Sequence, residues 1–383
     1  MKVKLETFLK EISEKTTCNN QYPVLTSSKS GLYLQSDYFN KQVASKDNTG
    51  YKIIRRGQFT YRAMSDTGEF FPNLLECTDV GIVSPAYPVF EITQPDAVAP
   101  EYLKYFFKSD SFQYSISSFA QGSTRTSIKF GKLKTVDINL PSIERQREIV
   151  FILDKASKLL ELRKEELAKL DELIKARFVE MFGDAVVNPM GWPTKELQDL
   201  VTDDCKISYG IVQTGDDQEE GVPVFRPVDI VNHVPVRSEL KRTTEEISNK
   251  YKRTILKGRE LLITVRANIA DTYIIDREFA GCNVGRGIVP IRTNEDVMVL
   301  EFLKHQLDSK HLNDDIKAMA KGITLIQLNM EDLRTVKLIV PPIEQQKAFV
   351  SFAKHVDKSK VAVQKSLDET QELFDSLMQD YFG

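Results

Sequence analysis

The chain has 383 residues and a formal net charge of −3 at pH 7, with 28% charged and 41% hydrophobic residues. These values exclude an intrinsically disordered chain, and they exclude a protein that binds nucleic acid through overall charge alone. No apolar run approaches the ~18 residues that a membrane span needs, and the first residues do not form a signal peptide. We therefore expect a soluble, cytoplasmic protein of two ordinary domains, with no membrane partner.

The sequence repeats itself at a fixed offset of 200 residues. The matching segments are Glu101-Tyr102-Leu103-Lys104 with Glu301-Phe302-Leu303-Lys304, Leu133-Lys134-Thr135-Val136 with Leu333-Arg334-Thr335-Val336, Pro141-Ser142-Ile143-Glu144 with Pro341-Pro342-Ile343-Glu344, and Phe182-Gly183 with Phe382-Gly383. The period is too long for a solenoid, whose units have about 20–50 residues. The chain is therefore a duplicated domain, which predicts a pseudo-twofold protein that recognises something twice.

Each copy contains the same predicted elements in the same order. A β-rich, irregular module comes first, and its short β-branched or aromatic runs include residues 51–54, 80–83, 260–265 and 287–291. A helical stretch follows at 100–119 and 299–320, then a short extended segment that ends in proline at 136–141 and 336–341. Each copy finishes with a long helix. The predicted fold class is α+β, with two mixed α/β modules separated by two long helices.

The long helices carry heptad repeats. In the first copy Leu153, Leu160, Leu167, Ile174 and Met181 are seven residues apart, and in the second copy Phe349, Val356, Val363 and Leu377 follow the same spacing. Sustained heptads predict a coiled-coil seam. The seams are interrupted at different layers, by Arg163 and Arg177 in the first helix and by Lys360 in the second, which favours pairing of the two helices with each other. A twofold axis between the copies makes that pairing antiparallel.

The segment 183–193 is rich in glycine and proline, and it ends the first long helix before the second module begins. We predict four segments: a first module at 1–140, a long helix at 141–183, a second module at 184–340 and a second long helix at 341–383. A helix over 144–182 would be roughly 58 Å long at 1.5 Å per residue.

Motifs for catalysis are missing from the sequence, which has no phosphate-binding loop and no dinucleotide-binding motif. Cys18, Cys77, Cys205 and Cys282, like His233, His305, His311 and His355, lack metal-ligand spacing. We expect reduced thiols, no metal and no cofactor. Asn188-Pro189 begins like the catalytic motif of adenine methyltransferases, but Met190-Gly191 follows, which indicates a turn. The chain is predicted not to be an enzyme.

Two basic stretches occupy corresponding parts of the copies. Residues 29–62 contain seven lysines and arginines against two acidic residues, and residues 237–259 contain eight against three. Such stretches are either phosphate-facing patches or solvated surface. From them and their flanks we nominate as DNA-binding residues Lys29, Tyr61, Arg62 and Arg125 in the first module and Arg226, Arg266 and Arg286 in the second.

The order of module, long helix, module, long helix resembles the specificity (S) subunit of type I restriction–modification systems over nearly the whole chain. The resemblance is carried by Leu-Pro-x-Ile-Glu-x-Gln at 140–146, which recurs with Val at 340–346, by the linker Phe182-Gly183-Asp184 to Trp192, and by Gly-x-Pro-x-x-Arg-x-x-Asp-Ile at 221–230. In the first module residues 22–31 replace that last stretch, so the two modules are not interchangeable in what they recognise.

The resemblance implies two target-recognition domains that read double-stranded DNA at an asymmetric, bipartite site, with the paired helices setting the gap between half-sites. It also implies that two methyltransferase subunits, which use S-adenosylmethionine, and restriction (endonuclease/translocase) subunits assemble on this chain. The shared helix surfaces at 144–183 and 344–383 would be their docking site. The subunit itself would hold no methyl donor and cleave nothing.

Two other functions remain open from the residues alone. A coiled-coil protein with two globular heads could be a scaffold for protein partners. Asp229, Glu239 and Lys241 have the loose acid–Glu-x-Lys pattern of a metal-dependent nuclease, although the first copy has no equivalent.

Overall fold

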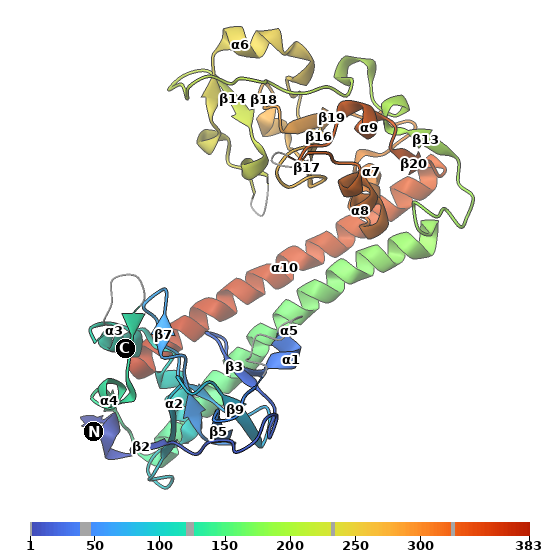
Figure 1. The fold of residues 1–383 in the computed structure, drawn as a ribbon. Helices are drawn as coiled ribbons and strands as arrows, with labels where there is room; N and C mark the ends of the chain where they lie inside the picture. The colour runs from blue at the N-terminus through green and yellow to red at the C-terminus, as the bar shows by residue number, and fades with distance from the viewer. Residues whose placement is uncertain (1, 39–46, 120–125, 231–233, 323–325) are drawn as a thin grey trace. The chain divides into compact units, whose positions relative to one another are not determined.

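Figure 1 shows the computed structural model, which describes the chain except for residues 1, 39–46, 120–125, 231–233 and 323–325. Contacts divide the chain into two compact units, residues 1–165 with 364–383 and residues 166–363. Each unit therefore contains one α/β module together with a part of each long helix.

The first unit has a four-stranded antiparallel sheet in the order β2-β10-β6-β8, and four strand pairs surround it. Its strands are β1 (Lys2–Lys4), β2 (Leu9–Ile12), β3 (Leu25–Ser27), β4 (Leu32–Leu34), β5 (Lys52–Arg55), β6 (Phe59–Thr60), β7 (Met64–Ser65), β8 (Asn73–Leu74), β9 (Val80–Val83), β10 (Val89–Ile92), β11 (Thr126–Ser127) and β12 (Asp137–Asn139). Its helices are α1 (Gln35–Tyr38), α2 (Pro100–Phe106), α3 (Asp110–Ser117), α4 (Phe130–Leu133) and the start of α5 (Ile143–Phe182).

The second unit repeats this plan with a three-stranded antiparallel sheet, β17-β16-β19, and a mixed sheet, β15-β14-β18. Its strands are β13 (Thr194–Glu196), β14 (Val222–Phe225), β15 (Arg242–Thr243), β16 (Leu261–Thr264), β17 (Thr272–Ile274), β18 (Asn283–Val284), β19 (Ile288–Ile291) and β20 (Lys337–Ile339). Its helices are α6 (Glu245–Lys250), α7 (Leu300–Leu307), α8 (Lys310–Ala318), α9 (Met330–Arg334) and the start of α10 (Ile343–Phe382).

Aromatic residues form the centre of each core. In the first unit Phe59 and Phe90 stack with ring centroids 5.4 Å apart on neighbouring strands. In the second unit Phe178 of α5 meets Phe302 of α7 at 5.6 Å and Phe349 of α10 at 5.3 Å. In the first unit Tyr102 of α2 also meets Phe382 of α10 at 5.0 Å. Because such rings bury large apolar areas, they help to hold each module against the long helices beside it.

The long helices run antiparallel. In the first unit the beginning of α5 meets the end of α10, since the Arg145 guanidinium lies 5.8 Å from the ring of Tyr381. In the second unit the end of α5 meets the beginning of α10 through Phe178 and Phe349. The prediction of an antiparallel pair within one chain is confirmed, as is the α+β fold class.

The heptad positions form the buried seam. Leu153, Leu160 and Ile174 of α5 are buried, as are Phe349, Val356 and Val363 of α10. Lys360, which interrupts the seam, extends to Asp171 of the other helix at 2.5 Å. Arg177 bonds to Glu180 at 2.8 Å, and its guanidinium lies 5.7 Å from the ring of Phe352 on α10. The long stems thus cover the seam while each charge meets a partner.

Residues 183–192 stop α5. Gly183 takes a left-handed conformation with φ of 73°, and its N–H donates to the carbonyl of Val179 at 2.8 Å. The Asn188 side chain then bonds to both the N–H and the carbonyl of Trp192, at 2.9 and 2.8 Å. The indole N–H of Trp192 donates to the carbonyl of Phe182 at 3.2 Å. Because both polar atoms of the Asn188 side chain are used within the turn, the interpretation of Asn188-Pro189 as a turn is confirmed.

Candidate nucleic-acid interface

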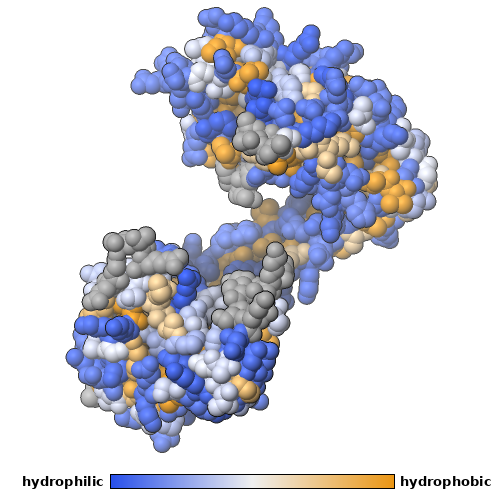
Figure 2. Space-filling model, viewed as in Figure 1, coloured by the Kyte–Doolittle hydropathy of each residue, from blue (hydrophilic) through white to orange (hydrophobic). Residues whose placement is uncertain are grey.

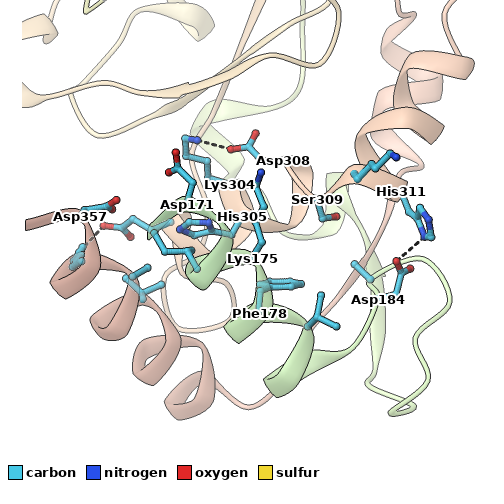
Figure 3. Close-up of a pocket in the computed structure, with 18 of the residues that line it drawn as sticks. Asp171, Lys175, Phe178, Asp184, Lys304, His305, Asp308, Ser309, His311 and Asp357 are labelled. Carbon is cyan, nitrogen blue, oxygen red and sulfur yellow. Dashed lines mark hydrogen bonds and ion pairs between the residues drawn. The ribbon is translucent and has the colours of Figure 1, made fainter. Parts of the chain in front are cut away.

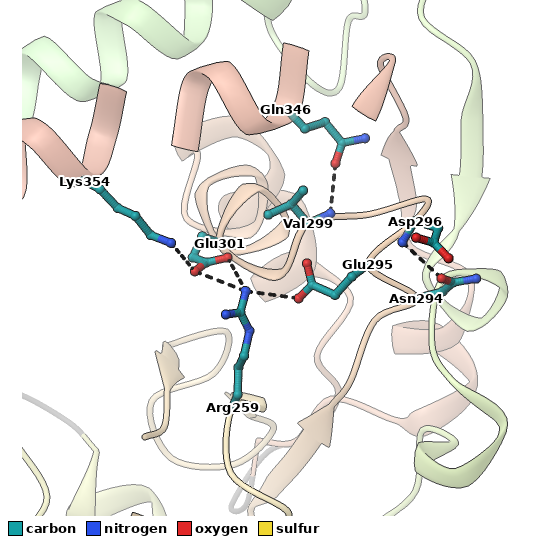
Figure 4. Close-up of polar contacts among 8 residues, drawn as sticks. All are labelled: Arg259, Asn294, Glu295, Asp296, Val299, Glu301, Gln346 and Lys354. Carbon is teal, nitrogen blue, oxygen red and sulfur yellow. Dashed lines mark hydrogen bonds and ion pairs between the residues drawn. The ribbon is translucent and has the colours of Figure 1, made fainter. Parts of the chain in front are cut away.

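The basic stretches of the sequence do not become uniformly basic surface. In the first unit Arg55 pairs with Glu14 at 2.7 Å and Arg56 with Asp79 at 2.8 Å. In the second unit Arg259 lies between Glu295 and Glu301, at 3.3 and 3.2 Å, and Lys354 of α10 also bonds to Glu301 (Figure 4). Acidic residues far away in the sequence therefore neutralise much of the charge that the local count suggested.

Two nominated cations of the first unit are exposed. Lys29 bonds to Glu69 at 2.9 Å and lies 5.2 Å from the ring of Phe71. Arg62 lies 3.7 Å from Asp66. Exposed ion pairs of this kind exchange readily for phosphate contacts, because each stabilises the fold by less than about 1 kcal/mol. Arg125 lies outside the described residues.

Tyr61 must be corrected, because the structure places it in the core. Its side chain is fully buried, and its ring packs 6.4 Å from that of Phe90. Its hydroxyl donates to the carbonyl of Ile128 at 3.1 Å, and burial raises the pKa of the phenol. The residue continues strand β6, where side chains alternate between faces, and it falls on the inner face while Arg62 falls on the outer one. Tyr61 therefore cannot reach a base.

The three nominated arginines of the second unit come together around Gly287. A Cβ atom at Gly287 would lie 2.6 Å from Pro227, the residue after Arg226, and 3.6 Å from the Cβ of Arg266. Arg286 is the preceding residue. A side chain at this position would collide with the Pro227 ring, which favours glycine there. The folded chain thus brings the backbone positions of three arginines that are at least 20 residues apart in sequence close to one another.

Each of these arginines is held differently. The Arg226 backbone N–H and Nε donate to Asp229 Oδ2, at 2.6 and 3.1 Å, while Nη2 donates to Oδ1 at 2.7 Å. Arg266 donates from Nε and Nη2 to Oε1 of Gln327, at 3.1 and 2.5 Å. The Arg286 guanidinium lies 5.9 Å from the ring of Tyr209. The Arg226 side chain is therefore occupied by its bonds to Asp229 within the turn at 226–229. Arg266 and Arg286, in contrast, contact the uncharged side chains of Gln327 and Tyr209.

The geometry does not support the nuclease set. Both carboxylate oxygens of Asp229 accept bonds from Arg226, and Lys241 donates to the carbonyl of Gly215 at 3.0 Å. Among the described residues, no group of three His, Cys, Asp or Glu side chains could hold a metal ion. The four cysteines are free thiols.

A cavity of about 690 Å³ lies in the second unit between the long helices and α7 and α8 (Figure 3). Its apolar lining includes Ile174, Phe178, Val350 and Ala353. His311 Nδ1 lies 2.7 Å from Asp184 within it, and the His305 ring meets that of Phe349 at 5.0 Å. Burial lowers the pKa of His305, and Lys304 adds to the shift. The residues that line this cavity include no nucleophile that is hydrogen-bonded to a base. The cavity is therefore a space between packed helices.

The first unit has larger side chains at two positions that correspond to the lining of this cavity. Tyr105 stands where the second copy has His305, and Leu153 stands where it has Ala353. The Tyr105 hydroxyl donates to Asp154 at 2.7 Å, and its ring lies 6.4 Å from that of Phe374. The two copies therefore share a backbone plan but differ in how their helices are packed.

The surface that Figure 2 shows is mostly hydrophilic on both modules, with hydrophobic residues scattered between polar ones. Among the described residues, no helix is long and apolar enough to cross a membrane.

The family model for the type I restriction modification DNA specificity domain matches this chain twice, at residues 6–172 and 189–372. The chain belongs to this family. Each match covers one module and most of the long helix after it, so the resemblance inferred from the order of modules and long helices and from their motifs is confirmed.

Curated proteins of the same family are distant relatives. The Type I restriction enzyme EcoBI specificity subunit of Escherichia coli is 27% identical over 184 residues, which cover 48% of this chain and 39% of that protein. Two Methanocaldococcus jannaschii proteins also match: the putative MjaX specificity subunit at 23% over 67% of this chain and 60% of its own, and the MjaIX specificity subunit at 25% over 75% and 69%. The matches thus span less than two thirds of the length of the EcoBI and MjaX specificity subunits.

Solved structures share the fold. The type I restriction-modification S subunit from M. genitalium aligns with a TM-score of 0.56 at 13% identity, covering all of this chain and 96% of that one. A chain from a study of complex assembly and conformational transition of the type I R-M system aligns at 0.61 with 19% identity, covering all of this chain and 97% of that one.

Sequence reasoning missed Gln327 and Tyr209, the neutral partners of Arg266 and Arg286. Nothing in their local sequence marks them. The repeat offers one signal for Gln327, which stands 200 residues after Ser127. Where two copies of one backbone carry different side chains, those side chains are candidates for recognising different ligands.

Proposed function

We propose that the chain is the DNA-recognition subunit of a cytoplasmic type I restriction–modification complex and is itself non-catalytic. The observation that carries the proposal is the double match to the DNA specificity family, one in each module. The surface around Gly287 supports it, since Arg266 and Arg286 present guanidinium groups held by neutral partners. Such groups donate well to guanine and to phosphate.

The target is proposed to be bipartite and asymmetric. Each module would read one half-site of double-stranded DNA, with a gap between the half-sites that neither reads. The modules differ where they would touch DNA: the Arg226–Asp229 turn belongs to the second, whereas in the first residues 22–31 contain strand β3 and the turn that leads into β4. Two different surfaces on one repeated backbone favour two different half-site sequences.

The partners are proposed to be two methyltransferase subunits, docked on the long helices, together with restriction subunits. Support comes from α5, where Phe151, Leu159 and Leu162 are exposed large hydrophobic residues on a helix that already has a partner. Their spacing places them on one face with Lys155, whose ammonium lies 4.1 Å from the ring of Phe151. Apolar side chains left on one face of a paired helix are typical of a further protein contact.

A mobility-shift experiment tests the proposal. The purified chain, alone and with its methyltransferase subunits, is titrated into a duplex carrying the target and into an unrelated duplex. We expect sequence-dependent binding, and neither cleavage nor methylation by the chain alone. Binding to protein partners without any DNA binding would instead establish a scaffold, and Mg²⁺-dependent cleavage by the chain alone would establish a nuclease.

A further inference from the structure

The two units contain the same backbone pairing at a position where their side chains differ. The N–H of Ile128 donates to the carbonyl of Ala63 at 3.0 Å, and 200 residues later the N–H of Leu328 donates to the carbonyl of Val265 at 2.9 Å. One position before, Ser127 pairs with Met64 and Gln327 pairs with Arg266. The same bridge therefore presents Met64 with Ser127 in the first unit and Arg266 with Gln327 in the second.

Sequence comparison alone would equate the wrong residues. Thr60-Tyr61-Arg62-Ala63 matches Thr264-Val265-Arg266-Ala267, which makes Arg62 the counterpart of Arg266. In the structure, however, the residue opposite Ser127 is Met64, which comes two residues after Arg62. Met64, and not Arg62, is therefore the structural counterpart of Arg266. Because side chains alternate with a period of two, a slip of two residues keeps the outward face. The bridge therefore presents the same face in both units with different chemistry.

The pair in the second unit has the geometry of a base reader. Gln327 Oε1 accepts from Nε and from Nη2 of Arg266, which fixes the guanidinium plane. The guanidinium has five N–H donors, so the edge between its two terminal nitrogens retains donors for a bidentate contact. An arginine held in this way loses less rotamer entropy when it donates to O6 and N7 of guanine.

The charge around the bridge fits a nucleic acid. Arg226 and Arg286 directly precede Pro227 and Gly287, which contact each other beside Arg266. Asp229 is already bonded to Arg226, and Asp332, which Asn329 links to Gln327, pairs with Lys321 at 3.1 Å. In the first unit the pair is Met64, 46% exposed, and the exposed hydroxyl residue Ser127. A thioether carries no hydrogen-bond donor, and it suits contact with the methyl group of thymine.

We propose that this bridge is the specificity-determining position of each module, with Arg266 and Gln327 reading a guanine and Met64 with Ser127 making an apolar contact to a thymine. The inference rests on the proposed function, because it requires that the modules read DNA.

The test transplants the pair. The full chain with its methyltransferase subunits selects duplexes from a randomised library, and the base preference at every position is compared between the wild type and three variants. Arg266→Met with Gln327→Ser gives the second module the pair of the first. Arg266→Lys keeps the positive charge but removes the two parallel N–H donors of the guanidinium group. Met64→Arg with Ser127→Gln gives the first module the pair of the second.

We expect the first variant to lose about 5- to 150-fold of its guanine preference at one base pair of one half-site, with all other positions unchanged. Arg266→Lys should lose a similar part of that preference, while its affinity for unrelated DNA and the salt dependence of that affinity stay as in the wild type. The reciprocal variant should gain a guanine preference at one base pair of the other half-site.

Arg277→Met is the matched control, because it removes an exposed arginine of the same unit that lies outside the basic stretch at 237–259. Unfolding midpoints and binding of the methyltransferase subunits show whether each variant is folded. An equal loss of affinity for every duplex after Arg266→Met with Gln327→Ser would make Arg266 a phosphate contact and overturn the inference. An unchanged base preference in folded variants would also overturn it. A wild-type complex that selects no sequence would instead refute the proposed function itself.

Discussion

The side-chain oxygen of Gln146 on α5 accepts the backbone N–H of Ala99 at 2.9 Å, at the point where α2 begins. Its amide nitrogen donates to the carbonyls of Ala97 and Pro141, at 2.8 and 2.9 Å. Gln346 repeats all three bonds in the second unit, to Val299, Val297 and Pro341, at 3.0, 3.0 and 2.8 Å. Figure 4 shows the bond to Val299. Both glutamines are fully buried. The Pro-x-Ile-Glu-x-Gln motif therefore connects each long helix to the start of α2 in the first unit and of α7 in the second.

The first prediction concerns this tie. Gln346→Leu should lower the free energy of unfolding by at least about 2 kcal/mol, because it leaves one buried N–H and two buried carbonyls without their partner. Urea unfolding followed by circular dichroism measures the change. Gln364→Leu is the matched control on the exposed side of the same helix and should stay within about 0.5 kcal/mol of the wild type. Equal effects of the two substitutions would show that the tie contributes nothing.

The second prediction concerns pH and His305, whose pKa is lowered by burial and by Lys304. The unfolded chain takes up the proton of this histidine near pH 6.5, and the folded chain does so only at lower pH. Unfolding therefore gains a proton as the pH falls below about 6.5, so stability decreases in that direction. His305→Tyr, which supplies the residue of the first copy, should flatten the decrease between about pH 6.5 and 5 in urea unfolding curves. A slope that persists in the variant would assign it to other groups.

The third prediction concerns docking on α5. Phe151, 60% exposed, and Leu159 should lie in the contact with a methyltransferase subunit. Phe151→Ser with Leu159→Ser should raise the dissociation constant of that subunit about 5- to 30-fold, since each exposed anchor contributes roughly 1 kcal/mol. Isothermal titration calorimetry measures the binding. The control is Tyr114→Ser, which removes an 83% exposed aromatic residue of α3. If the variant binds as tightly as the wild type while DNA preference is unchanged, the subunits dock elsewhere.

The exposed apolar residues of α5, Phe151, Leu159 and Leu162, also predict an order of assembly. The residues of α10 at the matching positions are Ser351, Ser359 and Ala362, so at these positions the second helix has no large apolar side chain. Two methyltransferase subunits should therefore bind with different affinities. The double variant of α5 should weaken the tighter of the two binding steps.

The fourth prediction concerns the gap between half-sites. Removing one heptad from each long helix shortens each by about 10 Å, at 1.5 Å per residue. If the helices set the spacing, the recognised gap should shrink by about three base pairs, at 3.4 Å per base pair, while both half-site sequences stay the same. Library selection with the assembled complex gives both quantities. If the shortened complex still binds and the recognised gap is unchanged, the long helices do not set the spacing between half-sites.

The sequence by itself determined the features that local periodicity and repetition encode. The heptads of α5 and α10 predict a seam because a helix places every seventh residue on the same face, whatever surrounds it. The 200-residue offset predicts two copies of one fold, and an antiparallel helix pair follows from the symmetry of two copies. The turn at Asn188 could be predicted because it depends only on neighbouring residues.

The tertiary structure alone decided which side chains reach the surface and which charges remain unbalanced. Tyr61 and Arg62 are neighbours in a basic stretch, yet one is buried and the other exposed, because the strand alternates over a core built from distant residues. Arg259 is neutralised by Glu301, and Arg266 is held by Gln327, through contacts that span 42 and 61 positions. Only folding could bring Met64, and not Arg62, opposite residue 127. Strand register is set by long-range pairing, and no local pattern encodes it.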